Sequence, residues 1–397
     1  MYHDYTPADE IAKRLQALRA AVAAQKWDAA LIVQDVDLFY FSGTMQNALL
    51  FCPPTGNAIM MVKKYQERAQ RESAVEHVIP FSSWTELPTL ITKHHGAMPK
   101  IIGVELDVLP TKDYLRLQRI FNDVTIADSA PAIQQIRRIK SAYEIDLMKK
   151  AGEIGKMVYA EVPQVLREGM TEIELAGIMV AEAMRHGHQN YLRMRAFNSY
   201  AFSWHVLSGP AGGELSFIDA PMGGIGLSPS FPVGASQKKI ALHEPILIDF
   251  GICYQGYQID ETRMFCLRNV PREFKAAYEA ACRIEAAITA GARPGASCRK
   301  LYETGWETAR ALGYEESFMG PPGYKTRFIG HGIGLEIGEL PFIAEGHDYP
   351  LEQGMTFAVE PKMVFPGKGA VGIENTFAVT KDGVEKLTPA DEQLIEI

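Results

Sequence analysis

The sequence predicts a two-domain protein of the α/β (α+β) class. Helical and strand periodicities alternate from residue 9 to about Ile126, and a long amphipathic pattern opens a second region near Pro131. That second region weakly repeats itself at an offset of 126 residues. With 397 residues, 47% of them apolar, the chain is long enough to bury two cores. We therefore place the domains at residues 1–130 and 131–397.

The first domain is predicted from short alternating elements. Residues 9–25 carry apolar side chains at helical spacing, and Ala29 to Val33 form a strand-like apolar run. Further strand-like runs follow, separated by the turn residues 53–56, and a last helical pattern covers residues 114–121. No reactive constellation of side chains stands out in this region.

The second domain is predicted from a repeated helix signal. Glycines bracket two amphipathic segments of equal length, at 169–187 and 295–313. Thr171 with Glu174 forms a capping box at the start of one segment, and Ser297 is an N-cap candidate for the other. Two halves related by a pseudo-twofold axis explain the pattern. Chance similarity between amphipathic helices is the alternative.

Composition excludes several classes of partner. The net charge is −8 and the sequence has no basic run, which argues against nucleic acid and anionic membranes. The N-terminal segment is helical and acidic rather than continuously apolar, and no later segment holds 18 consecutive apolar residues. The five cysteines are scattered along the sequence, which indicates reduced thiols. We therefore expect a cytoplasmic protein.

Two aspartates interrupt a predicted buried β-hairpin at residues 246–265. Asp249 and Asp260 lie about equally far from the turn at 254–256, so a two-residue loop places them as cross-strand or diagonal neighbours. A three-residue loop separates them. Buried carboxylates repel one another unless a positive charge compensates, and a divalent cation does so. The alternative is that Asp249 caps a turn while Asp260 pairs with Arg263.

Three more polar residues occupy positions where a strand pattern calls for apolar ones. His331 lies in a glycine-flanked run, Glu360 ends an apolar strand, and Glu374 interrupts another. Four carboxylates and one imidazole suit two divalent ions, with Mn, Co, Fe or Zn as candidates. Two ions about 3.5–4 Å apart can bind a bridging water and polarise a carbonyl, which is hydrolytic chemistry.

Each of these three residues also has a purely structural interpretation. Glu360 can pair with Lys362, Glu374 can accept backbone N–H bonds, and His331 can be a satisfied core histidine. The joint occurrence of all five residues in strand-like patterns is what favours the metal interpretation.

The order of the motifs around these residues resembles a known family. The segments IDFG, GYQIDETRMF, GHGIGLE, FAVEP and GIENTFAVTKDG resemble those of the pita-bread metallopeptidases, which include prolidase, aminopeptidase P, methionine aminopeptidase and creatinase. RRIKSAYEI, beginning at Arg137, is similar to the join between the two domains of the prolidase and creatinase branch. The resemblance implies a creatinase-like N-terminal domain, a pita-bread catalytic domain, and commonly a homodimer.

The resemblance also implies metal roles. Asp249 binds one ion, Asp260 and Glu374 bridge two ions, and His331 and Glu360 bind the other. Glu360 is then the candidate general base on the bridging water. Creatinase lacks the metal site, so intact ligands argue against a metal-free mechanism.

Two positions depart from the family pattern. Family peptidases carry substrate-side histidines where this chain has Ser216 and Gly338. His205 is a candidate replacement, with a core or strand-edge role as its alternative. Arg193 and Arg195 alternate along a predicted strand and are candidates for binding a substrate carboxylate, with solvated arginines as the alternative.

The resulting prediction is a metal-dependent Xaa-Pro peptidase, either a proline dipeptidase or an aminopeptidase, acting on a small peptide. The missing histidines keep two alternatives open. One is a lyase or amidine-hydrolase reaction on the same centre, and the other is a metal-stabilised binding protein without turnover.

Overall fold

The computed structural model describes residues 4–196 and 204–397. It contains two compact units, and the chain passes from the first to the second between Arg137 and Arg138. The boundary predicted at residues 130–131 falls at the start of helix α6 (Ala130–Arg137), which this division assigns to the first unit. None of the helices in the described residues is long and apolar enough to cross a membrane.

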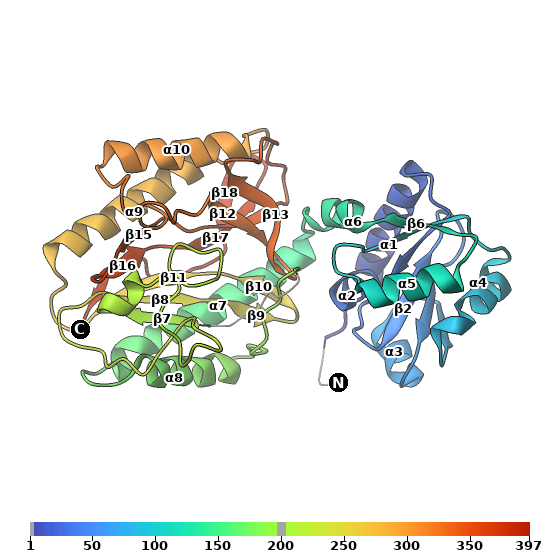
Figure 1. Ribbon diagram of the computed structural model, residues 1–397, viewed down its shortest axis with the longest axis horizontal. Coiled ribbons are helices and arrows are strands. Elements are labelled where there is room, and N and C mark those ends of the chain that lie inside the picture. The colour runs from blue at the N-terminus through green and yellow to red at the C-terminus, as the bar shows by residue number, and fades with distance from the viewer. Residues whose placement is uncertain (1–3, 197–203) are drawn as a thin grey trace. The chain divides into compact units, whose positions relative to one another are not determined.

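The first unit is built on a six-stranded mixed sheet, coloured blue to teal in Figure 1, in the order β4-β3-β2-β1-β5-β6. Its strands are β1 (Ala29–Ile32), β2 (Ala48–Cys52), β3 (Ile59–Val62), β4 (His77–Pro80), β5 (Ile101–Val104) and β6 (Thr125–Asp128). Its helices are α1 (Ala8–Ala24), α2 (Asp35–Ser42), α3 (Gln66–Glu72), the 3-10 turn η1 (Trp84–Glu86), α4 (Leu87–His95), α5 (Thr111–Ile120) and α6.

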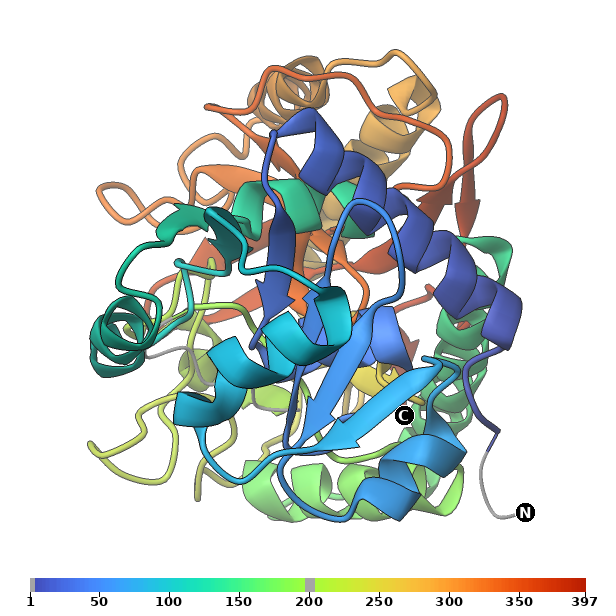
Figure 2. The ribbon, with the colours of Figure 1, turned by 90° about the vertical axis from the view of Figure 1, so that its right-hand side faces the viewer.

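Alternation along the strands gives this sheet two apolar faces. Leu31 and Phe51 face the side covered by Ile91 of α4 and Leu117 of α5. Helices α1 and α2 pack on the strands β1 and β2 (Figure 2, where α1 is the dark blue helix). The helix predicted for residues 9–25 and the strand predicted to begin at Ala29 are therefore confirmed.

The second unit contains two larger sheets and two short hairpins. The sheets have the orders β19-β11-β8-β7 and β13-β12-β14-β17-β18, and the hairpins are β9-β10 and β15-β16. The strands of the first sheet and first hairpin are β7 (Trp204–Ser208), β8 (Ile246–Phe250), β9 (Ile252–Tyr254), β10 (Tyr257–Ile259), β11 (Thr262–Cys266) and β19 (Ile395–Glu396). The remaining strands are β12 (Phe328–Ile333), β13 (Ile337–Ala344), β14 (Thr356–Val359), β15 (Lys362–Phe365), β16 (Gly369–Gly372), β17 (Asn375–Val379) and β18 (Val384–Lys386).

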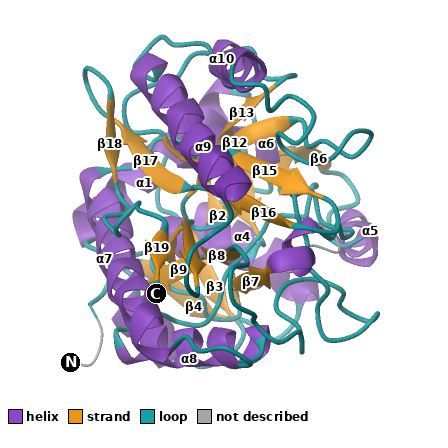
Figure 3. Ribbon diagram, turned by 90° about the vertical axis from the view of Figure 1, so that its left-hand side faces the viewer, coloured by secondary structure: helices purple, strands orange, loops and turns teal. Residues whose placement is uncertain are grey.

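Two pairs of helices pack around these sheets, and Figure 3 shows them in purple around the orange strands. They are α7 (Ala142–Val165) with α8 (Glu172–Arg185), and α9 (Arg272–Gly291) with α10 (Cys298–Ala311); a 3-10 turn, η2 (Gly209–Gly213), follows β7. Helices α8 and α10 both have 14 residues.

The ends of α8 and α10 explain the repeated glycines. Gly169, Gly187, Gly295 and Gly313 all adopt positive φ, between 80° and 101°. Side chains other than glycine rarely adopt this conformation. Thr171 forms the predicted capping box and Ser297 accepts the predicted N-cap hydrogen bond from Lys300 N. Both caps are confirmed, and the repeat has a structural basis.

Candidate metal centre

All five predicted ligands lie where the two large sheets of the second unit approach each other. Asp249 is on β8 and Asp260 follows β10, while His331 is on β12. Glu360 directly follows β14 and Glu374 directly precedes β17. An isolated antiparallel bridge between Thr262 and Glu374 joins the two groups of strands.

The two aspartates are diagonal neighbours. The turn of the β9-β10 hairpin has two residues, Gln255 and Gly256, both with positive φ. Thr262 pairs with Asp249 across β8 and β11, which leaves Asp260 two positions before the residue opposite Asp249. The predicted hairpin is thus two consecutive strand pairs, and Asp249 does not cap a turn.

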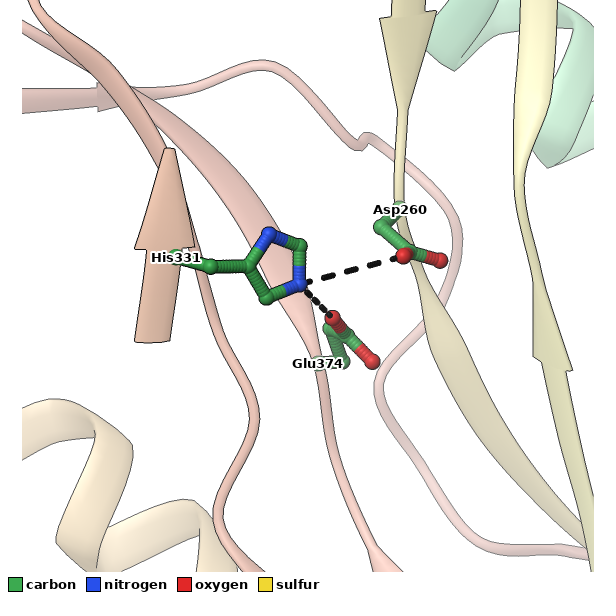
Figure 4. Close-up of side chains that lie close together, drawn as sticks. All are labelled: Asp260, His331 and Glu374. Carbon is green, nitrogen blue, oxygen red and sulfur yellow. Dashed lines mark ion pairs between the residues drawn. The ribbon is translucent and has the colours of Figure 1, made fainter. Parts of the chain in front are cut away.

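Three of the five side chains form a compact set of metal-type donors. One ligand atom each from Asp260, His331 and Glu374 lies within 4.8 Å of the others (Figure 4). His331 Nε2 is 4.0 Å from Asp260 Oδ2 and 3.8 Å from Glu374 Oε1. Glu360 Oε1 is 3.7 Å from the same nitrogen. These separations leave room for one ion at the usual ligand distance of about 2.0–2.2 Å.

The donor atoms themselves fit a cation at this place. Glu374 Oε1 is buried and has no hydrogen-bond partner among the described residues. His331 Nδ1 lies 3.2 Å from the carbonyl of Gly332, so a proton on Nδ1 leaves the lone pair of Nε2 facing the carboxylates. Carboxylate oxygens with a single imidazole suit borderline and hard divalent ions. Asp260, His331 and Glu374 therefore fit one divalent cation.

A lysine occupies the other side of the cluster. Lys362, the first residue of β15, is fully buried, and its ammonium nitrogen lies among three carboxylates. Nζ is 3.1 Å from Asp249 Oδ2, 2.7 Å from Glu360 Oε2 and 2.8 Å from Glu374 Oε2. The pairing of Glu360 with Lys362, one of the structural alternatives, is present. A second cation does not fit beside Asp249 with Lys362 in this position.

The carboxyl groups differ in how well they are compensated. Burial opposes ionisation of Asp249, yet Lys362 and His205 hold its pKa below its usual range. Burial and the neighbouring Asp249 raise the pKa of Asp260 well above its usual range. Burial also raises the pKa of Glu374, although Lys362 opposes this. The carboxyl groups on the His331 side of the cluster are therefore less well compensated by positive charge than Asp249 is.

Neighbouring side chains fix the backbone and the carboxylates. Thr262 Oγ1 donates to Glu374 Oε2 at 3.0 Å. Arg263 is buried, donates through Nη1 to the carbonyls of Thr262 and Glu374, and forms an ion pair of 2.6 Å with Glu261. The alternative in which Asp260 pairs with Arg263 is therefore wrong, because Glu261 takes that place.

His205 lies next to the centre. The two arginines that were also predicted to bind substrate, Arg193 and Arg195, do not lie on a strand. His205 is opposite Asp249 in the β7-β8 pair, with Nδ1 at 3.6 Å from Asp249 Oδ2. The strand predicted for Arg193 and Arg195 is wrong: among the described residues, which end at 196 on this side, the segment forms an isolated bridge from Met194 to Ile337 and no strand. Arg195 lies 3.7 Å from a Glu336 carboxylate oxygen. Arg193 stacks over the ring of Tyr191 at 4.7 Å.

The two positions that depart from the family pattern have different surroundings. Ser216 Oγ donates to the carbonyl of Pro232 at 2.5 Å. Gly338 has φ +83° on β13, and a Cβ added there meets no atom within 4 Å. Space is therefore open at Gly338, in a backbone conformation that favours glycine.

Sequence reasoning treated Lys362 only as a pairing partner of Glu360 and missed it as a member of the site. The available signal was its spacing: in an extended segment, residues two positions apart point to the same side. Glu360 and Lys362 satisfy that spacing across Pro361.

Paired helices around two sheets, with carboxylates and an imidazole converging between the sheets, define the pita-bread class of metal-dependent hydrolases. The family model of metallopeptidase family M24 matches residues 146–381, and that of the Creatinase/Prolidase N-terminal domain matches residues 14–139. The chain belongs to metallopeptidase family M24, and its family implies the use of a divalent metal.

Similar proteins span nearly the whole chain. A probable dipeptidase PepE of Mycobacterium tuberculosis strain H37Rv is 25% identical over 400 residues, covering 98% of this chain and 97% of the relative. An Xaa-Pro dipeptidase of Pyrococcus furiosus is 24% identical over 387 residues, covering 96% and 99%. The crystal structure of the Pyrococcus horikoshii OT3 prolidase superposes with a TM-score of 0.81 at 24% identity, covering 96% of this chain and 100% of that one.

Proposed function

We propose that this chain is a metal-dependent peptidase that cleaves small peptides, with Xaa-Pro dipeptides as the first candidate substrates. The observation that carries the proposal is the convergence of Asp260, His331 and Glu374, with the buried Glu374 Oε1 left without a hydrogen bond among the described residues. Relatives named dipeptidase and Xaa-Pro dipeptidase support the substrate class.

The residues of the site have complementary roles in this proposal. A divalent cation held by Asp260, His331 and Glu374 supplies a Lewis acid toward an amide carbonyl. Glu360 is the general base: its Oε1 faces the His331 side, and Lys362 holds its Oε2. His205, which lies beside Asp249, hydrogen-bonds the substrate. Arg193 and Arg195 bind the carboxylate of the substrate.

Turnover of a dipeptide panel tests the proposal. Purified protein supplied with Mn²⁺ or Co²⁺ is expected to release proline from an Xaa-Pro dipeptide. Asp260→Ala removes one of the three converging ligands and is expected to abolish the release. Asp382→Ala, at an exposed turn of the same unit, is the matched control and retains activity. Absence of turnover across the panel, with metal bound, contradicts the peptidase function.

A second reaction on the same centre is the competing candidate. Ser216 and Gly338 replace the substrate-side histidines, and the space at Gly338 is open. This favours a lyase or amidine-hydrolase reaction, which needs different substrate contacts. Turnover of a sulfonium or amidine compound, together with no turnover of any dipeptide, supports the lyase or amidine-hydrolase reaction over the peptidase.

We further propose that the protein is a cytoplasmic homodimer, on the strength of the resemblance to the prolidase and creatinase branch. Light scattering of the purified chain is expected to give twice the mass of one chain. A monomeric mass over the concentration range used for activity contradicts the dimer.

A further inference from the structure

We infer that Lys362 takes the place of one of the two cations of this centre, so that the chain binds a single divalent ion on the His331 side. The inference deepens the proposed metal-dependent function and rests on it. It concerns the number of ions and not the substrate.

The surroundings of the lysine nitrogen are those of a cation site. Three oxygens, each from a different carboxylate, surround Nζ at 2.7 to 3.1 Å. An ammonium group has three donors and no acceptor, so Asp249, Glu360 and Glu374 match all of its hydrogen-bonding capacity. A surface lysine pairing with one neighbour does not show this arrangement.

The two glutamates divide their oxygens between two positive centres. Oε2 of Glu360 and Oε2 of Glu374 both accept from Lys362. Oε1 of each faces His331 Nε2, at 3.7 and 3.8 Å. Carboxylates that bridge two cations are arranged in this way. Here one of the two positions is filled by the ammonium group.

Packing holds the lysine stem in place. Gly372 lies opposite Lys362 in the β15-β16 hairpin, and a Cβ added to Gly372 comes within 2.5 Å of Lys362 Cγ. The lysine carbonyl accepts a hydrogen bond from Met319 N at 2.8 Å. The absence of a side chain at Gly372 therefore creates the space that the lysine stem fills.

A second ion and the ammonium group exclude each other. An ion bound to the same three oxygens at about 2.0–2.2 Å lies almost where Nζ lies. Charge points the same way: the four carboxylates, when all are ionised by a bound ion, carry −4, and Lys362 with one divalent ion supplies +3. A second divalent ion gives +5 and leaves an excess of positive charge in a buried site, which is unfavourable.

Metal stoichiometry tests the inference without depending on turnover. Metal-free protein is titrated with Mn²⁺, and the bound ion is counted by elemental analysis after desalting and followed by electron paramagnetic resonance. We expect one Mn²⁺ per chain, with the signal of an isolated ion. Lys362→Ala frees the three carboxylates and the space, and we expect two Mn²⁺ per chain with the signal of a coupled pair.

Lys140→Ala is the matched control. Lys140 is equally buried in the same unit but pairs with a single carboxylate, that of Glu339, at 2.9 Å. Its removal is expected to leave the stoichiometry at one.

The outcomes separate this inference from the proposed function. Two ions in the unaltered protein, or one in a folded Lys362→Ala variant, overturn the role of Lys362 and leave the metal-dependent peptidase standing. No bound ion in the unaltered protein overturns both. If the variant does not fold, the number of Mn²⁺ ions bound by the unaltered protein decides alone. One ion per chain supports the inference, and two ions per chain contradict it. Dipeptide turnover is measured separately and bears only on the peptidase.

Discussion

Single buried polar residues determine the character of this site, and their effects depend on which neighbours reach them. Glu360 and Lys362 lie two positions apart in an extended segment, which places their side chains on one side of the chain. Glu374, 12 residues away beyond the β15-β16 hairpin, and Asp249, 113 residues away, reach the same ammonium group. A local motif thus supplies one contact, and the fold supplies the other two.

His188 gives a residue-scale prediction for the pH dependence of stability. Its ring is buried, accepts a hydrogen bond from Cys253 N at Nδ1, and packs edge-on against Phe250. Burial lowers the pKa of His188 to about 4 from an ordinary value of 6.5. Between these values the unfolded chain binds the proton and the folded chain does not. His188 therefore favours folding fully above pH 6.5, and this stability is lost as the pH falls toward 4.

The measurement is the difference between the unaltered protein and His188→Asn, in which the amide oxygen keeps the acceptor for Cys253 N. Over pH 6.5 to 4, the free energy of unfolding of the unaltered protein is expected to fall more steeply, by up to about 1.4 kcal/mol per pH unit. Buried Glu261 and Glu285, whose pKa values burial raises to about 7, act in the opposite direction in both proteins. Equal slopes in the two proteins contradict the role of His188.

At the scale of elements, the centre depends on the junction between strand β11 and the segment that precedes β17. The bridge from Thr262 to Glu374 is the backbone contact that joins them. Arg263 reinforces it by donating to the carbonyls on both sides and to the side chain of Asn375. The position of Glu374 therefore depends on a residue that does not itself face the ligands.

Arg263→Met tests this junction. The change removes a buried guanidinium and leaves Glu261 without its ion pair, so we expect a loss of about 3–5 kcal/mol of stability. Affinity for Mn²⁺ is expected to fall as well, because the Glu374 carbonyl loses the donor from Arg263 and keeps only the longer hydrogen bond from Thr262 N among the described residues. Thermal unfolding and calorimetric titration measure the two effects.

Arg299→Met is the control for that experiment. Arg299 forms an exposed pair with Glu303 on α10, a kind of pair worth about 0–1 kcal/mol. Similar losses of stability in the two variants contradict the importance of the junction.

At the scale of the whole molecule, each unit has its own hydrophobic core. The core of the first unit includes Leu31, Phe51 and Ile91, while that of the second includes Leu247, Ile284 and Phe357. No residue of the metal centre belongs to the first unit. The units are therefore expected to respond separately to damage in one core.

Leu31→Ala tests this independence. The side chain is fully buried, and its truncation is expected to destabilise the first unit by about 2–5 kcal/mol. Hydrogen exchange followed by mass spectrometry is expected to quicken in peptides from residues 4–137, with exchange in the second unit and Mn²⁺ stoichiometry unchanged. Faster exchange throughout both units contradicts separate cores.

The sequence anticipated much of the fold because local patterns and local structure agree. The caps at Thr171 and Ser297 depend on neighbours within three residues, and periodicity marks the helices that follow them. The predicted strand through Arg193 and Arg195 failed because strand formation needs a partner, and within the part of the chain that the structure describes Met194 forms a single isolated bridge.

For the site, the sequence by itself determined which donors are present: Asp249, Asp260, His331, Glu360 and Glu374, each in or next to a strand that leaves it buried or half-buried. Only the tertiary structure decided how these donors are divided between Lys362 and the cation site at His331. Lys362 enters the cluster because β8, the end of β14 and the start of β17 converge on one point. Charge compensation between buried groups depends on distances in space, and separations along the chain do not determine them.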